Sequence, residues 1–106
     1  MLNKFDEQKM KSLPLYLEQK GFILEQIERI EKYAIYSKYR KGFKKETFHY
    51  EVIMIQSHNG REINGRSIDP TEYYPSATKW GTLGFTCPSL QEAKEKLNKI
   101  IENARK

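Results

Sequence analysis

Apolar and polar positions alternate along the middle of the chain. From Thr47 to Ser57, aromatic or aliphatic residues occupy every second position, and further apolar residues lie in the opposite phase. A period of two residues is typical of a β-strand, and apolar groups in both phases indicate a strand that is covered on both faces. We therefore predict a central strand over Thr47–Ser57.

The preceding segment, Phe22–Tyr39, fits two patterns. One set of its apolar residues has helical spacing, whereas its second half alternates as a strand does. β-Branched and aromatic residues are dense from Ile30 to Tyr39 and pack better on a pleated sheet than on a helix, which favours a strand. Residues 22–32 stay open between helix and strand, and Arg40–Glu46 is typical of a hairpin loop. The helical set consists of Ile23, Ile27, Ile30 and Ala34.

The N-terminal segment, Phe5–Lys20, has a composition that favours a helix. Pro14 interrupts it, because proline lacks a backbone donor and disfavours helical geometry in the residue before it. Ser12 can cap the second piece, and Lys20 followed by Gly21 is typical of a helix C-terminus. The pattern therefore predicts an N-terminal helical segment in two pieces.

The last segment has the clearest signature. Ser89 and Glu92 are spaced as in a capping box, and the apolar residues that follow form one stripe at helical spacing. Acidic residues precede lysines by four positions, the favourable order for pairs on a helix. We predict an amphipathic helix from about Ser89 to Ala104. Its stripe consists of Leu90, Ala93, Leu97, Ile100, Ile101 and Ala104.

Turn residues divide the stretch between the central strand and this helix. Asn59-Gly60 and Asn64-Gly65 each suit the tight turn of a hairpin, since both residue types accept a positive φ. Asp69-Pro70 begins another turn. Ser76 can cap one turn of helix, and Thr82–Cys87 is suited to a final strand.

These segments together predict the fold class α+β, as a single domain over residues 1–106. We expect an antiparallel sheet of three to five strands, an N-terminal helical segment and a C-terminal amphipathic helix packed on one face. The chain has 106 residues and shows no repeat or linker. A chain of this length can bury one hydrophobic core.

The composition excludes several classes of protein. Apolar runs are only a few residues long, whereas a membrane span needs about 20, and the N-terminus has no apolar signal core. We therefore expect a cytoplasmic protein that does not enter a membrane. The single cysteine, Cys87, excludes an internal disulfide and a multi-cysteine zinc site.

Residues that commonly carry catalysis or bind metals are few. His49 and His58 are nine positions apart and would point to opposite faces of one strand, so only a bulge or turn would let them share a metal. Cys87 has no glycine-rich nucleophile elbow around it, which favours a buried structural cysteine. Residues 81–84 do not match a phosphate-binding loop, because the lysine of that motif is absent and the segment leads into a strand-like run rather than a helix. We predict no catalytic residue, no metal and no cofactor, and a protein that is not an enzyme.

The net charge of +5 lies in one segment. Residues 32–46 hold six lysines or arginines against one glutamate, and the rest of the chain is balanced. Aromatic residues are interleaved there, and proteins that bind single-stranded nucleic acid use cations for phosphates and aromatic rings for bases. A solvated hairpin whose lysines block pairing with other chains explains the same residues, so both interpretations stay open. The candidate binding residues are Lys38, Arg40, Lys41, Phe43, Lys44 and Lys45.

A second group of candidate binding residues lies in the segment after residue 72. Pro75 suits a turn, and Trp80 is large enough to close the edge of the core. Tyr73, Tyr74 and Trp80 also suit an aromatic recognition patch, since tyrosine and tryptophan dominate binding hot spots.

The same stretch carries a resemblance. A strand such as Tyr50-Glu51-Val52-Ile53, followed by Tyr74-Pro75-Ser76, Trp80-Gly81, Gly84-Phe85-Thr86 and a closing helix, is similar to a group of small uncharacterised proteins of bacteriophages and bacteria. The resemblance covers about residues 33–105 and implies a small α+β domain without an established catalytic role. On this basis we expect a non-enzymatic binding protein, an accessory or host-countering factor that occupies a host protein. The alternative is a nucleic-acid-binding module that uses the basic hairpin at residues 32–46.

Overall fold

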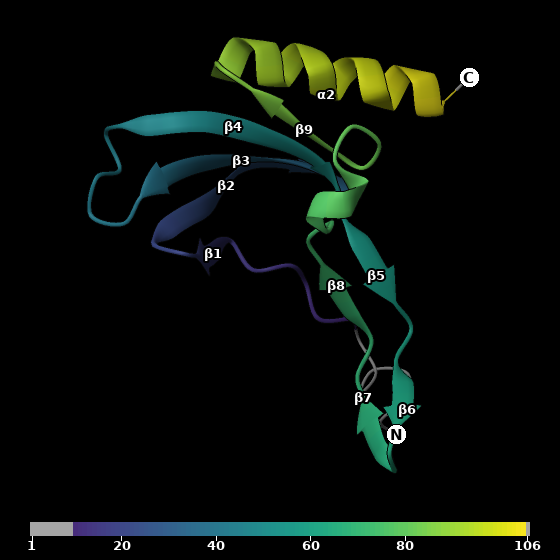
Figure 1. The fold of residues 1–106 in the computed structure, drawn as a ribbon. Coiled ribbons are helices and arrows are strands. Elements are labelled where there is room, and N and C mark those ends of the chain that lie inside the picture. The colour runs from purple at the N-terminus through teal and green to yellow at the C-terminus, as the bar shows by residue number, and fades with distance from the viewer. Residues whose placement is uncertain (1–9, 106) are drawn as a thin grey trace, which may run out of the picture.

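A five-stranded antiparallel sheet carries one helix on one of its faces and a long β-arm at one end (Figure 1). The computed structural model describes residues 10–105. The strand order is β1-β2-β3-β4-β9, so the expected α+β class and the antiparallel sheet are confirmed. The sheet consists of β1 (Tyr16–Gln19), β2 (Phe22–Ile30), β3 (Tyr33–Arg40), β4 (Thr47–Met54) and β9 (Gly84–Cys87), and the helix is α2 (Leu90–Ala104).

The predicted N-terminal helix is wrong for residues 12–20, and its first part, residues 5–9, lies outside the described residues. The chain has no regular secondary structure around Pro14 and then forms β1, which pairs with β2. Lys20 and Gly21 both have positive φ, 48° and 85°, as a tight hairpin turn requires. These residues therefore close a hairpin rather than a helix.

Residues 22–30 and 33–40 are strands, which confirms the strand interpretation of the second half and decides the open question for residues 22–32, of which only 31 and 32 lie in a turn. They form two strands rather than one, because Glu31 turns the chain with a φ of 56°. Glutamate is not a usual residue at this φ, so the turn gave no signal in the sequence. The Arg40–Glu46 hairpin loop is confirmed between β3 and β4.

Strand β4 is central, as predicted, and pairs with β3 on one side and β9 on the other. It ends at Met54, and the predicted extension to Ser57 leaves the sheet to form β5 (Gln56–His58) in the arm. The expectation of one hydrophobic core is wrong, because alternate residues of β3 and β4 supply two separate cores, one on each face of the sheet. Ile35 and Val52 lie in the core beneath α2, while Tyr36 and Ile53 lie in the core on the opposite face.

Helix α2 confirms the terminal prediction. Ser89 is its N-cap, and its hydroxyl accepts a hydrogen bond from the backbone N–H of Glu92 at 3.2 Å. The Glu92 carboxylate accepts from the Ser89 hydroxyl instead of from the backbone. Lys96 lies 4.1 Å from the centre of the Phe85 ring, so it packs on the sheet. The stripe residues Ala93, Leu97 and Ile101 are buried, Leu90 and Ile100 partly buried, and Ala104 exposed.

The face opposite α2 is closed at one end by residues from three segments. Arg29 on β2 donates two hydrogen bonds of 2.7 Å to Glu72, which also accepts from the backbone N–H of Leu13. Tyr36 accepts a hydrogen bond from Gln26 and donates one to the carbonyl of Pro14. These bonds fix the N-terminal segment and the arm to the sheet.

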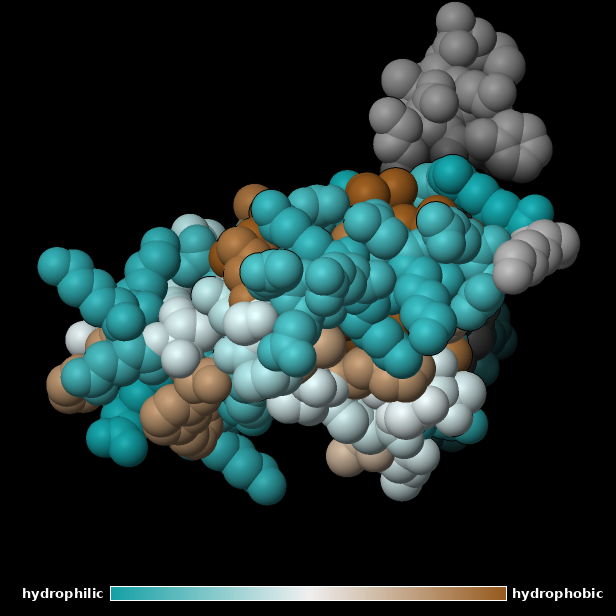
Figure 2. Space-filling view, turned by 90° about the horizontal axis from the view of Figure 1, so that it is seen from above, coloured by the Kyte–Doolittle hydropathy of each residue, from teal (hydrophilic) through white to brown (hydrophobic). Residues whose placement is uncertain are grey.

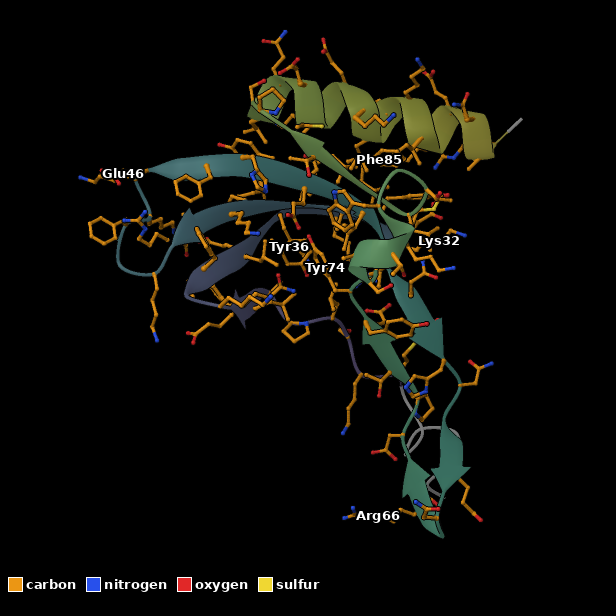
Figure 3. All side chains as sticks on the ribbon, viewed as in Figure 1. Lys32, Tyr36, Glu46, Arg66, Tyr74 and Phe85 are labelled. Atoms are coloured by element: carbon orange, nitrogen blue, oxygen red, sulfur yellow. The ribbon has the colours of Figure 1, made fainter. Side chains whose placement is uncertain are left out.

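The arm was not predicted as a unit. β5 pairs with β8 (Thr71–Tyr73), and β6 (Arg61–Ile63) pairs with β7 (Arg66–Ile68) through a turn at Asn64-Gly65 whose φ values are both positive. This turn confirms the prediction, whereas at Asn59-Gly60 only the glycine has positive φ and the chain continues along the arm. Arg66 marks the far end of the arm (Figure 3).

The segment after the arm returns to the sheet through a short helical turn, η1 (Ala77–Lys79). Ser76 precedes it, but its hydroxyl contacts that of Thr78 at 2.8 Å and makes no capping bond. The predicted position of this turn is therefore confirmed, and its predicted cap is wrong. The final strand begins two residues later than predicted, at Gly84.

Candidate ligand-binding surface

Aromatic rings and cations meet at the β3–β4 end of the sheet, on the face opposite α2. A bulge in β4 offsets the pairing with β3 beside Phe48, and the Phe48 ring lies 5.2 Å from that of Phe22 on β2. Arg40 lies within 6 Å of the Phe43 and Phe48 rings, a distance typical of a cation–π contact. Lys38 lies 5.2 Å from the Phe22 ring. We call Phe22, Lys38, Arg40, Phe43 and Phe48 the basic–aromatic surface.

This surface is open to solvent. Phe43 and Phe48 are 49% and 50% exposed, although a phenylalanine ring is usually buried. The guanidinium of Arg40 lies within 6 Å of both exposed rings, so a cation accompanies them. The other side of the sheet is different, because α2 presents a largely hydrophilic face to solvent (Figure 2).

The other predicted basic residues are placed differently. Lys41 lies 3.0 Å from Glu18, and Lys44 lies 3.1 Å from Glu25; both carboxylates belong to positions that alternate toward the α2 face. Within residues 10–105, no carboxylate lies within 4.0 Å of Lys38, Arg40 or Lys45. The predicted cluster of cations is therefore divided between the two faces of the sheet.

Lys32, which contributes to the charge of residues 32–46, is far from the hairpin loop. Figure 3 shows Lys32 and Glu46 at opposite ends of the sheet. Lys32 lies beside the ring of Tyr33. A run of charge in the sequence is not one surface when a whole strand separates its members.

A groove of about 420 Å³ opens beside the basic–aromatic surface, on the same face of the sheet. Lys38 belongs to both features, and the groove extends from it toward the aromatic residues that follow the arm. Its size is in the range of sites for small ligands. The groove is lined by Gln19, Lys38, Glu51, Tyr74, Pro75, Ala77 and Trp80.

Two of the three predicted aromatic residues belong to this groove. The rings of Tyr74 and Trp80 are nearly parallel, with their planes at 23° and their centres 6.2 Å apart. Tyr74 also meets Tyr36 edge to face (Figure 3). Tyr73 is separate, because it lies on β8 beside His58 in the arm. Trp80 packs against the core on the face opposite α2, as expected for a residue that closes the edge of the core, and is partly exposed.

A carboxylate lies at the wall of the groove. Only 9% of the Glu51 side chain is exposed, and its two oxygens have separate partners. Tyr74 donates its hydroxyl to Oε1, and Nε2 of His49 lies 3.1 Å from Oε2. Burial, together with the negative charge of Glu51, raises the pKa of Tyr74 above its ordinary value. Tyr74 therefore remains a hydrogen-bond donor to Glu51 at neutral pH.

No family model, no curated protein and no solved structure matches this chain. The function must therefore be inferred from the groove and the surface themselves.

Several residues of the surface and the groove were not predicted as site residues from the sequence. Phe48 was predicted only as a member of a strand, and Phe22 lay in the segment that stayed open between helix and strand. Their proximity depends on the β2–β3 turn and the β4 bulge. Glu51 stands between apolar residues in a central strand, a pattern that indicates a buried carboxylate. Gln19 falls in the segment that was predicted to be helical.

The other candidate groups do not form a site in residues 10–105. His49 contacts Glu51, His58 accepts a hydrogen bond from the backbone of Gly60, and no group of metal ligands is present in that range. Cys87 is buried in the core beneath α2, as predicted, and burial raises the pKa of its thiol. None of the helical structure in that range has the length and hydropathy of a membrane span.

Proposed function

We propose that the protein is a non-enzymatic binding module that holds single-stranded nucleic acid on the basic–aromatic surface. The observation that carries this proposal is the placement of two half-exposed rings, Phe43 and Phe48, around the guanidinium of Arg40. Exposed rings stack on unpaired bases, and nearby cations attract the phosphates between them.

This arrangement favours a nucleic acid over a host protein as the partner. An apolar docking site for a protein is typically a contiguous patch from which charged residues are depleted. Here the rings of Phe22, Phe43 and Phe48 each lie within 6 Å of a lysine or arginine. Alternating rings and cations match the repeat of a single strand, in which each base is followed by a phosphate.

The position of the cations gives a sharp test. Lys38 and Arg40 lie among the rings, whereas Lys41 and Lys44 are paired with carboxylates on the other side. The double variants Lys38→Gln/Arg40→Gln and Lys41→Gln/Lys44→Gln remove the same charge from the same hairpin. We expect the first to weaken binding of a labelled mixed-sequence single-stranded 12-mer at least ten-fold, and the second less than three-fold.

Two further measurements belong to this experiment. Phe43→Ala/Phe48→Ala should weaken binding by about 2 kcal/mol or more, because stacking contributes about 1 to 3 kcal/mol per base. The affinity of the unmodified protein should fall with salt by about 0.7 log units per phosphate contacted for each ten-fold increase. If Lys38→Gln/Arg40→Gln and Lys41→Gln/Lys44→Gln lose the same affinity, the binding depends on net charge alone and not on the position of the cations. No binding at low salt would overturn the proposal and favour a protein partner.

A further inference from the structure

We propose that the groove beside Lys38 receives one unstacked base of the bound strand and that Glu51 selects guanine at this position. The inference rests on the proposed function, because Lys38 joins the groove to the basic–aromatic surface. It goes further by assigning a sequence preference to a surface that otherwise attracts any single strand.

The groove has the parts that a base needs. Tyr74 and Trp80 form an aromatic wall, and aromatic side chains are the usual platforms for bases that are unstacked from their strand. Lys38 lines the same groove and is available to the phosphate beside the inserted base. A volume of about 420 Å³ is sufficient for one base and its sugar.

The buried carboxylate indicates which base. A carboxylate has about four acceptor sites on its two oxygens, and among the described residues each oxygen of Glu51 has one partner, Tyr74 or His49. One acceptor site on each oxygen therefore remains. Guanine presents two adjacent donors, N1–H and the N2 amino group, on one edge of the ring. Adenine and cytosine present a donor beside an acceptor, and thymine presents one donor between two acceptors.

The fold uses this carboxylate to hold the hydroxyl of Tyr74 and to contact His49, but those contacts do not require a charged residue. Glu51 lies opposite Tyr36 on β3 and Thr86 on β9, positions where a neutral side chain would avoid the cost of burying a charge. Among the side chains that the structure describes, the group within 4.0 Å of Glu51 that can carry a positive charge is His49, and only when it is protonated. Donors from a ligand would complete its hydrogen bonding, which is why we assign the residue to recognition.

The test uses decathymidine and three decamers in which one central thymidine is replaced by deoxyguanosine, deoxyinosine or deoxyadenosine. Their dissociation constants are measured by fluorescence anisotropy with the unmodified protein. We expect the deoxyguanosine decamer to bind about ten-fold more tightly than decathymidine, since a bidentate pair with a base discriminates by this order. Deoxyinosine lacks the N2 amino group, so its decamer should lose most of that gain.

The variant Glu51→Gln should reduce the guanine preference, measured as the ratio of the dissociation constants for decathymidine and the deoxyguanosine decamer, to less than three-fold. Should this variant fail to fold, as a thermal melt would show, the comparison of guanosine with inosine decides the question without any change to the protein. Equal binding of all four decamers, or tighter binding of the deoxyadenosine decamer, overturns the guanine pocket and leaves the proposed function standing. Failure of every decamer to bind overturns both.

Discussion

Gly84 is the position at which one added carbon atom should have the largest effect. It opens β9 and is buried beneath the indole ring of Trp80. A Cβ built at Gly84 would lie 2.4, 2.6 and 2.8 Å from three carbon atoms of that ring. Carbon atoms in contact are normally about 3.5 to 4.0 Å apart. In the variant Gly84→Ala, the indole must therefore move away by about 1 Å or more.

The magnitude follows from what the movement disrupts. The indole N–H donates a 2.9 Å hydrogen bond to the hydroxyl of Thr86, and a shift of about 1 Å would take this bond beyond its normal range. Adding a methyl group to a packed site typically costs about 1 to 3 kcal/mol. For about 2 kcal/mol and a domain of this size, the expected fall in Tm is about 8 to 16 °C.

Two measurements report this change separately. Circular dichroism gives the Tm, and Trp80 is the only tryptophan of the chain, so the fluorescence emission reports its environment alone. We expect a lower Tm together with a red-shifted native emission. Thr82→Ala is the matched control, because Thr82 is exposed in the same loop, and it should change neither. An unchanged emission maximum in Gly84→Ala would refute the reasoning, even if the Tm falls.

Three further predictions concern the two cores and their anchors. Leu97→Ala should lower the free energy of unfolding by about 3 kcal/mol in a denaturant titration, because the side chain is 1% exposed beneath the helix, and a change below about 1 kcal/mol would remove α2 from the core. Hydrogen bonds from Arg29 lower the pKa of Glu72, so its carboxylate stabilises the fold above the ordinary glutamate pKa, and this contribution is lost as the pH falls through the lowered pKa. The Tm should therefore fall more steeply below about pH 4 in the unmodified protein than in Glu72→Gln, and parallel profiles would contradict the anchor. Tyr36→Phe removes the hydroxyl that joins Gln26 to the N-terminal segment, and it should lower the free energy of unfolding by about 1 to 2 kcal/mol in the same denaturant titration. An unchanged midpoint would show that hydrogen bonds to water replace those of the hydroxyl at no net cost.

Local physical chemistry determined several parts of this protein in advance. The capping serine and the apolar stripe predicted the start of helix α2 to within one residue, because both patterns depend only on neighbours three or four positions away. The alternation of Thr47–Met54 identified the central strand for the same reason. The Asn64-Gly65 turn also needed only its own two residues, since both must accept positive φ.

Only the tertiary structure decided the rest, because the deciding interactions join distant segments. The segment of β1 has a helical composition, yet it is extended because β2 supplies partners for its backbone. Phe22 and Phe48 are 26 positions apart in the sequence and meet across the sheet, whereas Lys32 and the hairpin lysines are close in sequence and lie at opposite ends of a strand. The sequence alone therefore determined the charge and the aromatic content of the candidate site. Strand pairing decided which of those side chains share a face, because a turn or bulge of one residue reverses the side to which every later side chain points.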